Sequence, residues 1–161
     1  MRAKTILLLL IALLFTSVVS AQTRYPKREF RGAWIQCVNG QFQGMPAEKM
    51  QQLLINQLNS LQGAGINAII FQVRAEADAL YKSSYEPWSR FLTGVQGRVP
   101  SPYWDPMQFM IDECHKRGME FHAWINPYRA KTKGTTALSP IHPYNNCLLY
   151  TSPSPRDPKT S

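Results

Sequence analysis

Three short apolar segments that alternate with two amphipathic segments constrain the fold of this chain most strongly. Residues 30–38, 66–74 and 119–126 have the apolar alternation or the short apolar runs of β-strands. Between them, apolar residues recur at helical spacing over residues 46–63 and 105–118. Strands that are separated by a helix pair in parallel through right-handed crossovers. The order therefore predicts an α/β fold built on a parallel sheet.

Each predicted strand has one face that becomes polar toward its C-terminal end. The internal strands of an open doubly wound sheet are covered on both faces and are apolar throughout, so this pattern favours a (β/α)8 TIM barrel with an inward polar face. Such a barrel needs about 250 residues. The sequence supplies about three strands and two helices. We therefore expect the N-terminal portion of a truncated barrel.

The N-terminal segment, residues 1–21, has the features of a secretory signal peptide. Arg2 and Lys4 precede an apolar stretch at residues 6–15, which is too short to span a bilayer, and small residues lead to Ala21. A retained anchor is the alternative. Cleavage predicts an exported protein, whether periplasmic, cell-surface or secreted, with no stable membrane span.

The remaining boundaries follow from composition. Residues 22–28 are predicted to be a linker, and residues 29–144 the barrel portion. Residues 145–161 are rich in serine and proline and predict a disordered or non-native tail. The segment 147–157 also resembles translated adapter or vector sequence, which would make this chain a fragment of a longer protein.

Charge and cysteine content exclude several function classes. Residues 22–144 carry 14 Lys/Arg against 9 Asp/Glu, scattered without a basic run, so nucleic-acid binding is not expected. Export would permit a disulfide between Cys37 and Cys114, but two buried free thiols are the expectation. The chain lacks Cys-x-x-Cys and His-x-x-x-His spacing and a glycine-rich loop after the first strand, so neither a metal nor another cofactor is expected.

The end of the second strand offers the first candidate site. Arg74 could bind a substrate carboxylate or hydroxyl, could orient Asp78, or could form a local pair with Asp78 that only shapes the loop. An acid–base pair of Glu76 with Asp78 is weaker, because two carboxylates in a loop have no fixed separation.

The long connection over residues 75–104 offers the second candidate site, because loops of this length in compact domains are usually functional or disordered and this one is rich in aromatics. Phe91 and Leu92 are expected to form a small core that holds the loop. Trp88 could join that core or stack on a sugar ring.

The third strand offers the last candidate site. His122 could donate to a substrate hydroxyl, act as acid or base, or be a hydrogen-bonded structural residue. Trp124 could form a sugar platform or fill the barrel. Asn126 and Arg129 lie nearer the expected mouth, where a ligand role is more credible.

Three segments together resemble the N-terminal part of the glycosyl-hydrolase-like family 10 domain. They are FRGAWIQ, NAIIFQVRAEADALYKSSYEPWSRFLTGVQG and DPMQFMIDECHKRGMEFHAWINPYRA, and the match runs from about Glu29 to Arg129. The resemblance implies a (β/α)8 glycoside hydrolase-like domain of an exported bacterial protein that hydrolyses or binds a polysaccharide or peptidoglycan-type glycan.

The resemblance also implies a set of residues that face the cleft: Gln72, Arg74, Asp78, Tyr81, Trp88, His122, Trp124, Asn126 and Arg129. Glu76 stands where the family more often has a small residue, so no catalytic role is carried onto it. The catalytic carboxylates are expected on a later strand that this chain lacks. The fragment is then inactive by itself. A non-catalytic carbohydrate-binding module on the same scaffold is the alternative.

Overall fold

The computed structural model describes residues 29–133 and 137–146. The predicted signal peptide and linker, and residues 147–161 of the predicted tail, lie outside the described residues. The predicted boundary at residue 144 stays a prediction; the last described helix, α5, covers Pro143–Asn146. No helix in the described part is long and apolar enough to cross a membrane.

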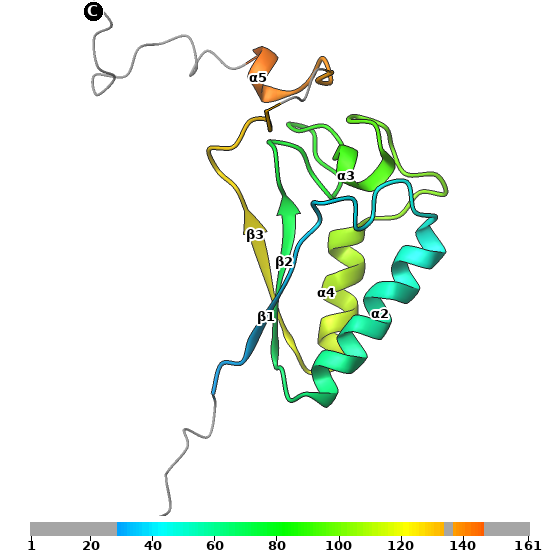
Figure 1. Ribbon diagram of the computed structural model, residues 1–161, viewed down its shortest axis with the longest axis vertical. Coiled ribbons are helices and arrows are strands. Elements are labelled where there is room, and N and C mark those ends of the chain that lie inside the picture. The colour runs from blue at the N-terminus through cyan, green and yellow to red at the C-terminus, as the bar shows by residue number, and fades with distance from the viewer. Residues whose placement is uncertain (1–28, 134–136, 147–161) are drawn as a thin grey trace, which may run out of the picture.

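The elements alternate as the sequence predicts. β1 (Gly32–Ile35) is followed by α2 (Ala47–Gly63) and β2 (Ala68–Arg74), and then by α4 (Pro106–Lys116) and β3 (Glu120–Ile125). The three strands form one parallel sheet in the order β1-β2-β3. Helices α2 and α4 lie side by side against one face of this sheet (Figure 1). The α/β class and the parallel sheet are thereby confirmed.

The helix-covered face of the sheet forms the hydrophobic core. Alternate residues of β2, among them Ile69 and Phe71, are fully buried. They pack with Leu54 and Leu58 of α2 and with Met110 of α4. Leu54 and Leu58 are four residues apart, so they lie on the same side of their helix. The opposite face is open: the Trp34 side chain is 69% exposed on β1.

Two short helices were not predicted, so the described residues contain four helices instead of two. α3 (Arg90–Thr93) lies within the long connection after β2, and Ser89 caps it by accepting a hydrogen bond from the Phe91 amide. A four-residue helix has too few positions to show a 3.6-residue period, which is why the sequence pattern did not reveal it. Phe91 and Leu92 are both buried, as expected, but they join the main hydrophobic core instead of forming a small core of their own.

β1 is shorter than the sequence predicts, and Cys37 lies beyond it instead of within it. Pairing with β2 ends at Ile35, and the Cys37 amide donates to Oε1 of the Gln72 side chain at 3.1 Å in place of a strand carbonyl. Cys37 and Cys114 are both buried and free, as expected. Burial raises the pKa of Cys37 to about 12, with the Asp78 charge adding to the effect, and burial raises the pKa of Cys114 to about 11.

Candidate functional site

The C-terminal ends of the three strands lie at the same end of the sheet, where the long connections gather (Figure 1). Arg74 is the last residue of β2, and Asn126 directly follows β3. A shift in the pairing register between Gln72 and Arg74 changes the alignment of these two strand ends. Ligand sites of parallel α/β folds form at this edge, so the polar side chains here are the candidate functional residues.

Arg74 is the centre of the first polar cluster. Its Nε donates to Oε1 of Glu86 at 2.6 Å, and its Nη1 donates to the carbonyl oxygen of Asn126 at 2.5 Å. The Asn126 side chain in turn donates to the Ala75 carbonyl at 3.1 Å and accepts the indole N–H of Trp124 at 3.0 Å. The cluster thus ties the ends of β2 and β3 to the long connection. Its members are largely but not completely buried, which leaves them accessible to a ligand.

Of the alternatives that the sequence left open for Arg74, a local pair with Asp78 is wrong. Asp78 is fully buried, where Oδ1 accepts the Glu76 amide at 3.2 Å and Oδ2 accepts the Gln96 side-chain amide at 3.2 Å. Between them, Ala77 has a φ of 50°, in the left-handed region that non-glycine residues rarely adopt. This conformation turns the chain so that the Asp78 carboxylate bonds back to the Glu76 amide. Arg74 pairs with Glu86 instead.

Tyr81 lies beside the Arg74 cluster. Its hydroxyl is 3.5 Å from Oε2 of Glu86. Burial raises the pKa of Tyr81, and the neighbouring Glu86 carboxylate raises it further, because both disfavour the phenolate; the Arg74 charge acts in the opposite direction. The phenol therefore keeps its proton at neutral pH and can act as a hydrogen-bond donor.

Glu76, to which the family resemblance gave no catalytic role, is the centre of a second polar cluster. Its side chain is 1% exposed and accepts two hydrogen bonds from Arg90, at 3.0 Å from Nε and 3.2 Å from Nη2. The Thr132 hydroxyl donates to the same carboxylate, and Nε2 of the buried His142 donates to the Glu76 carbonyl at 2.7 Å. Nδ1 of His142 accepts the Tyr144 amide at 3.0 Å, which assigns the Nε2–H tautomer.

The other predicted site residues are dispersed. Gln72 is buried and bonds Cys37. Trp88 is half-buried and packs edge-on against Tyr103, with ring centroids 6.2 Å apart. His122 lies on the open face in the middle of β3, where Nε2 is 3.0 Å from a Glu120 oxygen. The nine predicted residues therefore do not form one group: Arg74, Tyr81, Trp124 and Asn126 come together, and the rest surround them or lie apart.

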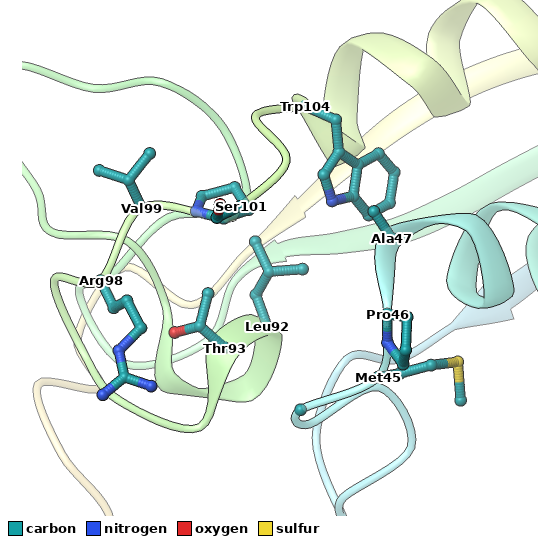
Figure 2. Close-up of a pocket in the computed structure, with 11 residues that line it drawn as sticks. Met45, Pro46, Ala47, Leu92, Thr93, Arg98, Val99, Ser101 and Trp104 are labelled. Atoms are coloured by element: carbon teal, nitrogen blue, oxygen red, sulfur yellow. The ribbon is translucent and has the colours of Figure 1, made fainter.

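A cavity of about 350 Å³, called here the strand-end cavity, lies where the connections after all three strands meet. Asn39 follows β1, Arg90 belongs to the connection after β2, and Arg129 follows β3. Arg129 is the one predicted site residue among the residues that line it. A different cavity of about 410 Å³ lies at the start of α2, where Figure 2 shows Arg98 and Trp104 on opposite sides, and none of the predicted site residues lines it.

Metal binding has no structural support in the described part of the chain. Within residues 29–133 and 137–146, no group of three or more His, Cys, Asp or Glu side chains could hold a metal ion. The three carboxylates nearest the strand ends, those of Glu76, Asp78 and Glu86, each accept hydrogen bonds from a guanidinium or an amide. Their arrangement stabilises loops by charge-assisted hydrogen bonds.

Sequence reasoning missed several members of the two clusters. Glu86, Arg90, Thr132 and His142 were not among the predicted site residues. The arginine and glutamate in the long connection gave a weak signal, since charges among buried aromatics need partners. For Thr132 and His142 the sequence gave no signal, because their contacts with Glu76 join residues 56 and 66 positions apart.

Comparison with known proteins identifies the family. The model of the family described as "Glycosyl hydrolase-like 10" matches residues 29–151, most of the chain. The chain belongs to this family. The resemblance found in the sequence is thereby confirmed.

Two curated proteins that are similar to this chain are named glycosyl hydrolases. The chain is similar to glycosyl hydrolase YngK of Bacillus subtilis (strain 168), at 42% identity over 139 residues, covering 76% of this chain and 27% of that protein. It is also similar to glycosyl hydrolase DigH of Escherichia coli (strain K12), at 41% identity over 120 residues, covering 68% of this chain and 27% of that protein. The chain thus spans about a quarter of the length of these family members.

Proposed function

We propose that this chain is the N-terminal part of a (β/α)8 barrel from an exported bacterial protein, and that it binds glycan at the C-terminal ends of its strands. The observation that carries the proposal is the Arg74 cluster. It joins a guanidinium, a carboxylate, an amide and an indole at the edge of a parallel sheet in a glycosyl hydrolase-like chain. Aromatic faces and planar hydrogen-bonding groups are the chemistry that recognises sugar rings.

The barrel proposal is supported by the arrangement of the layers. Helices α2 and α4 cover one face of the sheet (Figure 1). The pairing register puts Trp34, His122 and Trp124 on the other face. A barrel has its helices outside and packs such side chains inside, and further strands would pair with the free edges of β1 and β3. The relatives are long enough to supply these strands, since the chain covers 27% of each.

The nine predicted residues take roles in glycan binding under this proposal. Arg74, Tyr81 and Asn126 would donate to sugar hydroxyls, and Trp124 and Trp88 would provide stacking faces. Gln72 and Asp78 are buried and would hold the loops in position without touching the glycan. His122 and Arg129 would contact more distant parts of the glycan. A cell-wall glycan strand is one candidate ligand.

A non-catalytic binding domain is the second candidate function. Glycoside hydrolysis needs one carboxyl group as acid and a second as base or nucleophile, about 5 Å apart in retaining enzymes. Glu76 and Glu86 are instead held by arginines, and Asp78 by amides. This arrangement favours either binding without cleavage or a catalytic pair supplied from beyond residue 144.

Binding of glycans to the full chain tests the proposal. Soluble chito-oligosaccharides and peptide-free cell-wall glycan strands would be titrated calorimetrically against the wild type and against Trp124→Ala. We expect the variant to bind at least about tenfold more weakly, because stacking contacts of an aromatic face are lost. Trp34→Ala removes an equally large exposed indole from β1 and is the matched control.

Two results would count against glycan binding at this edge: no glycan binds, or the Trp34→Ala and Trp124→Ala variants bind alike. Release of reducing ends during the same incubations would separate hydrolysis from binding alone. Export is tested by fusing residues 1–28 to a reporter that is active only outside the cytoplasm. An inactive reporter would remove export from the proposal.

A further inference from the structure

The strand-end cavity is basic. Arg129 is exposed and has no hydrogen-bond or ion-pair partner within residues 29–133 and 137–146. Arg90 uses its Nε and Nη2 to bind Glu76, which leaves Nη1 for another acceptor. No aspartate or glutamate lines the cavity.

The charges next to the cavity do not cancel this basic character. The Glu76 carboxylate below it is buried and already accepts from Arg90 and Thr132. Lys131 and Lys133 follow Arg129, and residues 127–133 contain no acidic side chain. An anion that entered would therefore meet uncompensated positive charge in a partly enclosed space, where charge interactions are stronger than in bulk water.

The Arg90 guanidinium is held in a fixed orientation by two neighbours. Its guanidinium lies over the ring of Phe91, 4.3 Å from the centroid, while the Glu76 carboxylate fixes its plane. An arginine that is already ordered loses little side-chain entropy when it binds a carboxylate. Asn39 and Gln43 line the same cavity and offer amide donors and acceptors to hydroxyl groups.

We propose that the strand-end cavity binds the carboxylate of an acidic sugar, with Arg129 and Arg90 as the recognising groups. At about 350 Å³ the cavity falls within the usual size range of small-molecule sites, and it is larger than a bare inorganic anion requires. The ligand is therefore a sugar unit that carries the anion. This inference rests on the proposed glycan binding and specifies the substrate class as acidic glycan.

A matched pair of ligands tests the inference on the full chain. Trigalacturonate and its methyl ester share rings and linkages, but only the first carries carboxylates. We expect the acid to bind about tenfold or more tightly than the ester, since a hydrogen bond to a charged group has this effect on affinity. Arg129→Gln should remove the preference. Arg98→Gln, which removes the same charge at the cavity shown in Figure 2, should keep it.

The outcomes separate this inference from the proposed function. Equal binding of acid and ester would overturn the acidic-sugar site and leave glycan binding intact. A preference for the acid that Arg98→Gln weakens as much as Arg129→Gln would reflect general positive charge, and would also overturn the site. If neither the acid and ester nor the neutral chito-oligosaccharides bind, both proposals fail. If the preference is lost only in Arg129→Gln, the site is supported.

Discussion

The central strand and the connection that follows it are buried by different kinds of interaction. Along β2, Ile69 and Phe71 are covered by the apolar faces of α2 and α4. Just past its C-terminal end, Glu76 and Asp78 are equally inaccessible, yet they are covered by polar partners. Apolar contacts tolerate small shifts of position, whereas a buried carboxylate is tolerated only when its hydrogen bonds are made.

The helix-covered face stabilises the fold, whereas the strand-end clusters arrange the side chains of the candidate site. The helix-covered face contributes buried apolar side chains from β2, α2 and α4 to the core. The strand-end clusters hold the connections after β2 and β3 in one arrangement, through Arg74 with Asn126 and through Glu76 with Arg90 and Thr132. Substitutions in the two regions should therefore differ in size and in what they disturb.

The largest effect is expected in the apolar region. Phe71→Ala removes a fully buried ring from the middle of the core and should lower the free energy of unfolding by about 3–5 kcal/mol. Urea denaturation followed by circular dichroism measures it. Trp34→Ala, which removes an indole that is 69% exposed, is the control and should change stability by less than about 0.5 kcal/mol. Equal effects would show that the open face is covered in solution.

The next effect concerns the Glu76–Arg90 pair. Arg90→Met leaves a carboxylate that is 1% exposed without its cation and should cost about 3 kcal/mol. Glu76→Gln should cost less, because the Arg90 side chain is 27% exposed and can be hydrated. Glu29→Gln breaks the exposed pair with Arg31 and should cost at most about 1 kcal/mol.

Chemical denaturation of these variants ranks them. If Arg90→Met were no more costly than Glu29→Gln, the strand-end loops would open readily to water. The idea that they form a fixed platform for a ligand would then be wrong.

The helix-covered face could be predicted from the sequence because its determinants are local. Met50, Leu54 and Leu58 are four residues apart, so their helical spacing alone shows that they share a face. Asp105 likewise caps α4 by accepting the Gln108 amide, and the proline that follows it suits the first turn of the helix. Interactions within one element are encoded within a few residues.

The strand-end clusters could not be predicted because their partners are distant and aperiodic. The sequence left open a pairing of Arg74 with the carboxylate four positions away, but Arg74 binds Glu86, 12 positions away. An isolated bridge between Ala79 and Trp88 turns the connection back toward the strand end and brings Glu86 to Arg74. No spacing rule reports such a turn. The sequence indicated at which edge of the sheet the candidate site should lie, and the long-range contacts decide which residues meet there.

The smallest expected effect is a change in the pKa of Tyr81, which lies between the apolar core and the strand-end clusters. Burial and the Glu86 carboxylate raise the pKa of Tyr81. The unfolded chain therefore loses this phenolic proton first, and the contribution of Tyr81 to stability declines as pH rises above its ordinary value of about 10. Glu86→Gln removes one of the two causes, so the Tyr81 pKa should fall toward the ordinary value. Phenolate absorbance during an alkaline titration measures this, and subtracting the Tyr81→Phe titration isolates the residue. An unchanged Tyr81 titration in Glu86→Gln would mean that burial alone sets the pKa, and that the phenol belongs to the apolar region and not to the Arg74 cluster.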